Sequence, residues 1–122
     1  MSKSEAFTKI KIDVIKIVGC IPHGKITTFK AIGNYMTVMP RHVAYILSQL
    51  SPEEQDEIPW HRVVGDLGKL GKEKTNARGQ SQSELLTTEG LLVASSRIAN
   101  FESVFIQASS LNCTVQPAQN YS

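Results

Sequence analysis

The sequence predicts a mainly α-helical protein that folds as a single winged helix-turn-helix-like domain. Three features support this prediction: apolar residues recur at helical spacing, two of the expected helices are short and joined by a brief turn, and a glycine-rich stretch follows them. The chain has 122 residues, of which 41% are hydrophobic and 20% are charged. A chain of this size and composition is expected to fold around one modest core.

A first helix is expected near the start of the chain, from Phe7 to about Val18. Its apolar residues recur at helical spacing and indicate core packing, and Gly19 ends the pattern. Residues 1–6 are polar and are expected to form a flexible N-terminus. Cys20 follows in an apolar setting, so we expect a small buried side chain rather than a reactive thiol.

Two short helices come next and form the predicted helix-turn-helix. Thr27 or Thr28 can cap the first of them, which is expected over residues 29–36. The second is expected over residues 41–50, where apolar residues occupy positions i, i+3, i+4 and i+7. The pair is typical of a helix-turn-helix, although any small helical bundle shows the same spacing.

A glycine-rich loop and one more helix complete the expected domain. Glycines recur through residues 65–71, and this turn-rich loop is expected to form a small wing beside the helices. Ser81 and Glu84 have the spacing of a capping box, which predicts a helix that starts there. Gly90 is placed to end that helix as its C-cap.

The chain is expected to divide into a main domain over residues 7–90 and a C-terminal extension over residues 91–122. Within the extension, residues 91–93 and 104–106 are predicted to be short strands. From about residue 108 onward the chain is polar and is expected to be disordered, so the extension is partly disordered.

The distribution of charge is more informative than its total. The formal net charge of +2 is only mildly basic and indicates no particular partner. Four basic residues cluster in one short stretch: Lys69, Lys72, Lys74 and Arg78. A basic loop of this kind can follow phosphates, while an ordinary solvated surface explains it equally well.

Several classes of protein are excluded by the same inspection. No apolar run approaches the about 20 residues that a membrane span needs, so no membrane contact is expected. The start of the chain lacks the build of a secretory signal, so an intracellular location is expected: cytoplasmic in a prokaryote, nuclear in a eukaryote. Cys20 and Cys113 form neither a CxxC motif nor part of a metal-ligand cluster, and no metal site is expected.

The most specific motif is Ile-Pro-Trp-His-Arg-Val at residues 58–63. Together with residues 21–29 and 40–47, it resembles the C-terminal, DNA-binding domain of the O6-alkylguanine-DNA alkyltransferases, whose signature is Ile-Pro-Cys-His-Arg-Val. The resemblance covers roughly residues 7–90. Trp60 stands at the position of the acceptor cysteine. In this respect the chain is similar to the alkyltransferase-like proteins, which are non-enzymatic sensors of alkylated guanine in DNA.

The resemblance implies that no residue of this chain is catalytic. Alkyl transfer from guanine requires a thiolate, and the indole of Trp60 offers only a hydrogen-bond donor. In the family, a histidine activates the cysteine through a water and a glutamate orients that histidine. His61 and Glu89 match these two positions. They are therefore expected to remain as a structural hydrogen-bond network.

The resemblance also implies a pocket for an extruded base. Trp60, Val63 and Phe29 are expected to line this lesion pocket, with Phe29 at a position where the family usually has tyrosine. Arg41 matches the family's arginine finger, which enters the base stack and fills the space of the flipped nucleotide. Ala44 matches a small residue that lets the helix approach the minor groove closely.

Contacts with DNA are expected from a further set of residues, Lys25, Thr28, Lys30, Ala44 and Arg62, and of these Lys25, Thr28 and Lys30 are expected to contact phosphates. Two positions depart from the family pattern. Glu73 stands where the family often has tyrosine or arginine, and Ser51 replaces the asparagine of an Asn-Pro pair. An acidic group is poorly suited to contact a guanine edge or a phosphate.

The function implied is that of a DNA-damage sensor acting on double-stranded DNA that contains O6-alkylguanine. The protein would bind the minor groove, flip the lesion into its pocket, and flag it for nucleotide excision repair proteins, acting as a monomer without a cofactor. Two alternatives stay open. One is a helix-turn-helix regulator of undamaged DNA, and the other is a residual alkyltransferase that uses another residue.

Overall fold

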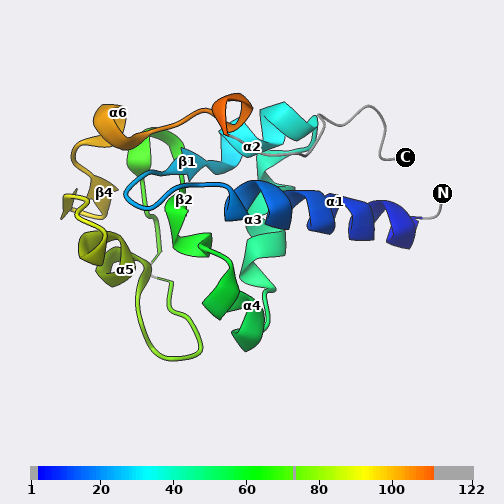
Figure 1. The fold of residues 1–122 in the computed structure, drawn as a ribbon, viewed down its shortest axis with the longest axis horizontal. Coiled ribbons are helices and arrows are strands. Elements are labelled where there is room, and N and C mark those ends of the chain that lie inside the picture. The colour runs from blue at the N-terminus through cyan, green and yellow to red at the C-terminus, as the bar shows by residue number, and fades with distance from the viewer. Residues whose placement is uncertain (1–2, 73, 112–122) are drawn as a thin grey trace.

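The computed structural model describes residues 3–72 and 74–111. Two short parallel strands lie between two groups of elements, with helices α1 to α4 on one side and α5, a hairpin and α6 on the other (Figure 1). The α-helices are α1 Lys3–Gly19, α2 Phe29–Met36, α3 Pro40–Ser48, α4 Pro52–Glu57, α5 Gln82–Thr88 and α6 Phe101–Val104. The strands are β1 Thr27–Thr28, β2 Val63–Val64, β3 Val93–Ala94 and β4 Arg97–Ile98. Single 3-10 turns are found at Trp60–Arg62, Asp66–Gly68 and Ala108–Ser110.

Two hydrophobic clusters correspond to the two sides of the molecule. The first lies among α1, α2 and α3 and includes Val14, Ile32 and Val43. The second lies under α5 and the hairpin and includes Leu86 and Ile98. None of the helices in the described ranges has the length and apolar character of a membrane span.

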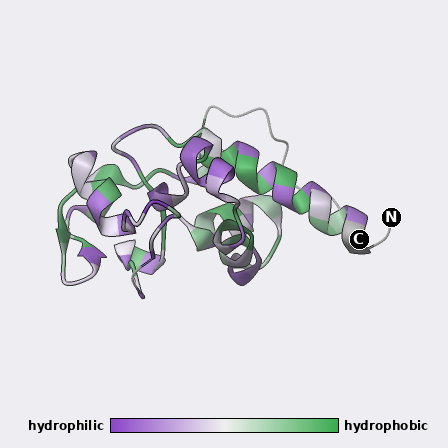
Figure 2. Ribbon diagram, turned by 90° about the horizontal axis from the view of Figure 1, so that it is seen from below, coloured by the Kyte–Doolittle hydropathy of each residue, from purple (hydrophilic) through white to green (hydrophobic). Residues whose placement is uncertain are grey.

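The first helix begins earlier than predicted. Residues 3–6, expected to be flexible, form its first turn, and Ala6 is buried. Apolar residues form a stripe along α1 (Figure 2), but Phe7 lies outside the core with 43% of its surface exposed. It packs edge-to-face against Tyr45 of α3, with 6.3 Å between the ring centroids. Cys20, predicted to be buried, is half-buried beside the first cluster.

The helix-turn-helix follows the prediction closely. Helix α2 has the expected bounds, and the hydroxyl of Thr28 caps it by accepting from the amide of Ala31 at 2.9 Å. The turn to α3 brings the backbone of Gly33 against that of Val38, whose amide donates to the Gly33 carbonyl at 2.9 Å. A Cβ at Gly33 would lie 2.7 Å from the Val38 oxygen, so only glycine fits this turn. Helix α3 starts at Pro40, one residue earlier than expected.

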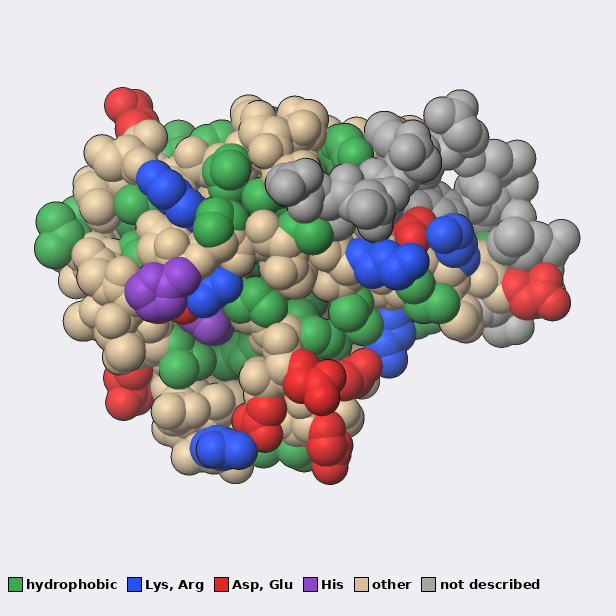
Figure 3. All heavy atoms as spheres, in the orientation of Figure 1, with side chains coloured by type: hydrophobic (Ala, Val, Ile, Leu, Met, Phe, Trp, Pro, Cys, Tyr) green, Lys and Arg blue, Asp and Glu red, His purple; other side chains and the backbone are tan. Residues whose placement is uncertain are grey.

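The acidic stretch before the motif is a helix, α4, which the sequence did not predict. The hydroxyl of Ser51 accepts from the amide of Glu54, whose carboxylate accepts from the Ser51 amide, so the pair forms a capping box. Figure 3 shows acidic side chains gathered at the end of the molecule where α4 lies; those of the helix are Glu53, Glu54, Asp56 and Glu57. A surface of this charge repels phosphates.

The parallel pairing of β1 with β2 was also not predicted. It aligns Thr27 with Val63 and Thr28 with Val64. Because α2 follows β1 directly, this pairing brings the start of α2 next to the motif at residues 58–63. It therefore assembles the candidate site from two distant segments of the chain.

The wing is a hairpin in the C-terminal extension rather than the glycine-rich loop. Strands β3 and β4 pair across Ser95 and Ser96, which both have positive φ angles (51° and 58°), typical of a tight two-residue turn. Within residues 65–71, the 3-10 turn Asp66–Gly68 packs against β4. Helix α5 begins with the predicted capping box and ends at Thr88. Its C-cap is Glu89, and Gly90, the predicted C-cap, is the next residue, with a φ of +91°.

The expected strand at residues 104–106 is reduced to a single bridge between Phe105 and Ile26. Disorder from residue 108 is wrong for the first four residues. Ala108 and Leu111 are buried against the first cluster, because the chain crosses back over it. Residues 112–122, including Cys113, lie outside the described ranges.

Candidate functional site

The motif at residues 58–63 is a short 3-10 turn that leads into β2. The amide of Trp60 donates to the carbonyl of Ile58 at 2.7 Å, and Val63 closes the turn by donating to Trp60. Trp60 is buried by this tight turn and is only 8% exposed. The next two residues, His61 and Arg62, are partly buried. Trp60 therefore belongs to the first hydrophobic cluster.

The indole is also one wall of a cavity of about 260 Å³. The cavity is lined by Phe29, Ala44, Leu47, Ser48, Gln55, Trp60, Val63, Lys74, Thr75 and Gln82. All three residues predicted for the pocket, Trp60, Val63 and Phe29, are in this lining. Ala44, predicted to allow close approach of DNA, lines it as well. The site thus combines an aromatic and aliphatic lining with several amide and hydroxyl groups, which suits a flat aromatic ligand with polar edges.

Arg41 lies outside this lining, at the exposed start of α3. It is three residues before Ala44 and seven before Ser48, so the three residues share one face of the helix. Within the described part of the chain, no hydrogen bond or ion pair holds its guanidinium. The side chain is therefore placed at the edge of the face that borders the cavity, without an intramolecular partner there to immobilise it.

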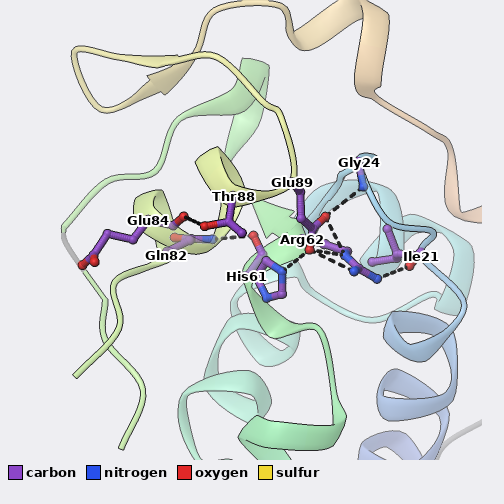
Figure 4. Close-up of polar contacts among 8 residues, drawn as sticks. All are labelled: Ile21, Gly24, His61, Arg62, Gln82, Glu84, Thr88 and Glu89. Carbon is purple, nitrogen blue, oxygen red and sulfur yellow. Dashed lines mark hydrogen bonds and ion pairs between the residues drawn. The ribbon is translucent and has the colours of Figure 1, made fainter. Parts of the chain in front are cut away.

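His61 and Arg62 converge on the carboxylate of Glu89 (Figure 4). The His61 Nε2 lies 2.6 Å from Glu89 Oε2, and the Arg62 Nε lies 3.0 Å from both carboxylate oxygens. The amide of Gly24 donates to the same carboxylate at 2.8 Å, and Arg62 Nη1 donates to the carbonyl of Ile21 at 2.7 Å. This network joins the motif, the end of α5 and the turn before β1, and agrees with the structural role expected of His61 and Glu89.

The protonation states of the network follow from its surroundings. Burial lowers the pKa of His61, although the bond to Glu89 acts in the opposite direction. Burial by itself would raise the pKa of Glu89, but hydrogen bonds from Arg62, Gly24 and His61 outweigh it and lower this pKa to about 2. Near neutral pH a neutral His61 thus faces an ionised Glu89. Because a carboxylate only accepts, the Nε2 of His61 carries the proton.

Two residues expected to contact DNA have other roles in the structure. The guanidinium of Arg62 is committed to Glu89 and Ile21, and its side chain is only 16% exposed. Thr28 is buried and caps α2. Both side chains point inward because the motif turn and the start of α2 are anchored by these contacts. The predicted contacts of these two residues with DNA stay predictions.

The remaining predicted contacts lie at the surface. Lys25 and Lys30 are exposed, and the ammonium of Lys25 donates to the carbonyl of Ser103 at 3.3 Å. Glu73, where the sequence departs from the family pattern, lies outside the described residues. Ser51, the other departure, caps α4.

Sequence reasoning missed Gln82, which the structure places between the motif and the cavity. The residue is 2% exposed, and its side-chain amide donates to the carbonyls of His61 and Val63 at 3.1 and 3.0 Å. The capping box at Ser81 fixes where α5 begins, but nothing in the sequence shows which way its first residue points. The sequence did not predict Gln55, Lys74 and the other polar lining residues for the same reason.

No three His, Cys, Asp or Glu side chains come together as a metal-binding group within the described ranges.

Comparisons with known proteins agree on one family. The model of the family described as "6-O-methylguanine DNA methyltransferase, DNA binding domain" matches residues 9–91. Alkyltransferase-like protein 1 of Schizosaccharomyces pombe is 30% identical over 104 residues, which cover 84% of this chain and 91% of that protein.

Two crystal structures from the same yeast share the fold. One is Atl1 in complex with damaged DNA containing O6-carboxymethylguanine, with a TM-score of 0.65, 27% identity, and coverage of 88% of this chain and 99% of that one. The other, ATL in complex with DNA, has a TM-score of 0.66, 30% identity and the same coverage. The predicted fold class is confirmed. The chain belongs to the family of the O6-methylguanine-DNA methyltransferase DNA-binding domain and, within it, to the alkyltransferase-like proteins.

Proposed function

We propose that this protein is a DNA-damage sensor that binds O6-alkylguanine in double-stranded DNA and holds it without removing the alkyl group. The alkylated base is flipped out of the duplex and enters the cavity beside Trp60. The observation that supports this most is the position of that cavity, which is bordered by the motif on one side and by α3 on the other. A helix next to a base-sized pocket can lie against DNA while the pocket receives the base.

The lining suits an extruded guanine and its adduct. Trp60 and Phe29 offer aromatic surface, and stacking of a base on an aromatic ring contributes about 1–3 kcal/mol. Gln55 and Gln82 offer amide groups that can donate to and accept from base edges. Arg41, at the exposed start of α3, is the group that we assign to the gap left in the base stack.

Binding is expected to proceed without alkyl transfer. Trp60 occupies the acceptor position, and an indole has no nucleophilic sulfur. No cysteine is among the described residues that line the cavity, and Cys20 lies half-buried at the end of α1. A captured lesion therefore dissociates unchanged, and the complex lasts as long as its dissociation rate allows.

The surface around α3 is the expected contact with the minor groove. Ala44 is small enough to allow close approach of the helix, and Lys25 and Lys30 are exposed for phosphate contacts. The acidic helix α4 disfavours phosphates on its own surface. We assign the bound form to a single copy of the chain on each lesion.

A direct test compares matched duplexes that contain guanine or O6-methylguanine at one position. Fluorescence anisotropy should show tighter binding to the lesion, and intact-protein mass measured after incubation should be unchanged. Equal affinity for both duplexes would defeat the proposal. A mass increase equal to the alkyl group would instead identify a residual alkyltransferase.

We further propose that the held complex flags the lesion for nucleotide excision repair, in the cytoplasm of a prokaryote or the nucleus of a eukaryote. A protein that binds without turnover has a use only if another system removes the lesion. Deleting the gene should sensitise cells to an alkylating agent, and it should add no sensitivity in cells that already lack excision repair. Additive sensitivity of the double deletion would contradict this role.

A further inference from the structure

Lys74 places a charge in the cavity. It precedes α5 and lines the cavity together with Phe29, Trp60 and Gln82. Its ammonium lies over the ring of Phe29, 4.9 Å from the ring centroid. All other lining residues are uncharged, so Lys74 alone determines the net charge of the lining.

The fold holds this lysine in place through its backbone. The carbonyl of Lys74 accepts from the amide of Gln82 at 2.9 Å, and the next residue, Thr75, pairs with Ser81 in an isolated antiparallel bridge. These contacts tie Lys74 to the capped start of α5. The backbone of Lys74 is therefore fixed, and its flexible side chain carries the ammonium to the cavity.

The ammonium has no anionic partner within the described part of the chain. Although the residue as a whole is exposed, its neighbours partly desolvate the charged end and lower the pKa of Lys74. An anion brought into the cavity would compensate for this loss of water. A neutral ligand of the same size would leave the cation unpaired.

We propose that Lys74 makes the pocket selective for O6 substituents that end in an anionic group, such as a carboxylate. This inference rests on the proposed function, because it presumes that the alkylated base enters the cavity. The ammonium then forms a charge-assisted hydrogen bond with the adduct itself. O6-carboxymethylguanine is the simplest adduct that carries such a group.

A DNA phosphate is the competing partner for the same charge. The groove that adjoins the cavity past Lys74 has three further charged lining residues, Asp66, Lys69 and Lys72, and none of the three borders the cavity. Lys69 and Lys72 are the better candidates for contacts with the DNA backbone. A phosphate contact would strengthen binding to every duplex alike, whereas contact with the adduct acts on anionic adducts alone.

The test uses duplexes that differ only at one guanine O6: unmodified, methyl, carboxymethyl, and carbamoylmethyl, which is the neutral match to carboxymethyl in size. Dissociation constants are measured by anisotropy at fixed pH and at two salt concentrations. We expect the wild-type protein to bind the carboxymethyl duplex about tenfold more tightly than the carbamoylmethyl duplex, as one charge-assisted bond predicts.

Variants assign that preference to one side chain. Lys74→Met, which keeps the stem and removes the charge, should reduce the ratio to about one, and Lys74→Arg should retain it. Lys72→Met is the matched control, because it removes a positive charge two residues away, from a side chain that does not line the cavity. It should keep the ratio while weakening all duplexes alike, and thermal unfolding should show that every variant folds.

Each other outcome has a definite meaning. A wild-type ratio near one, with O6-methylguanine still preferred over guanine, would overturn this inference and leave the proposed function standing. Equal weakening of all duplexes by Lys74→Met, with a shallower salt dependence, would overturn it in favour of a phosphate contact. If no lesion is preferred over guanine, the proposed function fails first.

Discussion

At the scale of the single residue, Thr27 carries a hydroxyl that the fold leaves unsatisfied. It is fully buried in β1, and its Oγ1 has no hydrogen-bond partner among the described residues. A buried unpaired hydroxyl costs about 1–3 kcal/mol. We expect Thr27→Val to raise the free energy of unfolding in urea by about 1 kcal/mol, because the methyl group has the same shape without the penalty. Thr28→Val removes the cap of α2 and should lower the free energy of unfolding by about 1 kcal/mol. If both variants lower the free energy of unfolding, the hydroxyl of Thr27 is not a source of instability.

Glu89 gives a second prediction, for pH. The pKa of Glu89 is lowered from 4.5 to about 2 and that of His61 is lowered from 6.5, so the unfolded chain binds more protons than the folded chain. The contribution of His61 is complete above pH 6.5 and is lost as the pH falls toward its folded pKa. That of Glu89 is complete above pH 4.5 and is lost between pH 4.5 and about 2.

Urea unfolding between pH 8 and pH 3 measures this dependence. We expect stability to fall as the pH is lowered, and Glu89→Gln to destabilise the protein at neutral pH by about 2–4 kcal/mol, since it leaves the partly buried Arg62 beside a neutral amide. In this variant, the decrease in stability that the protonation of Glu89 causes below pH 4.5 should be absent. Wild-type stability that rises on acidification would contradict the assigned charges.

Arg41 supports a prediction about binding. Arg41→Ala should weaken binding to O6-methylguanine DNA by about ten- to a hundredfold, the loss expected when one stacked group is removed. Since the side chain is exposed, the melting temperature should not change. Arg41→Lys keeps the charge and loses the planar guanidinium, so it should retain binding to undamaged DNA better than binding to the lesion. Equal effects of both substitutions would reduce the role of Arg41 to its charge.

At the scale of the element, the turn between α2 and α3 depends on Gly33. A Cβ there would lie 2.7 Å from the Val38 oxygen and 3.2 Å from the Pro40 nitrogen, and both are backbone atoms. Gly33→Ala should therefore lower the free energy of unfolding by about 1–3 kcal/mol, as overpacking does. Gly19 is the matched control, because a Cβ at its position has no neighbour within 4 Å. Gly19→Ala is expected to change stability by less than about 1 kcal/mol, and similar losses in both variants would show that the close approach is not the cause.

The elements also show how far sequence reasoning reaches. The bounds of α2 and the capping box of α5 were predictable, because helical spacing and caps are local signals. The pairing of β1 with β2 was not, since two-residue strands have no period and their partners are far apart in sequence. Helix α4 was missed because its residues are polar throughout, although its own capping box was visible in the sequence.

The candidate site divides in the same way. The motif and its spacing located Trp60, Val63 and Phe29, which do line the cavity. The directions of the side chains depend on tertiary packing, so the sequence did not show that Arg62 forms an ion pair with the carboxylate of Glu89. Lys74, the charged member of the lining, is one of several similar lysines in the sequence, and only the fold separates it from the others.

At the scale of the whole molecule, the segment after Gly90 completes both hydrophobic clusters. Ile98 is 1% exposed in the second cluster, and Leu111 is buried in the first. The helix-turn-helix and the motif therefore do not make a finished core by themselves. The C-terminal extension acts as a cover that holds α5, and with it Glu89 and Gln82, against the motif.

Ile98 allows this dependence on the extension to be tested without truncating the chain. Ile98→Ala should lower the free energy of unfolding by about 2–4 kcal/mol, because it opens a cavity in the second cluster. Leu92→Ala, from the same hairpin region but 61% exposed, should change it by less than about 0.5 kcal/mol. At temperatures where the Ile98 variant is still folded, its preference for O6-methylguanine over guanine should equal that of the wild type, since Ile98 does not line the cavity. If Ile98→Ala leaves the free energy of unfolding unchanged, the hairpin does not contribute to the stability of the domain. If the variant is folded but no longer prefers O6-methylguanine over guanine, the second cluster is part of the binding site.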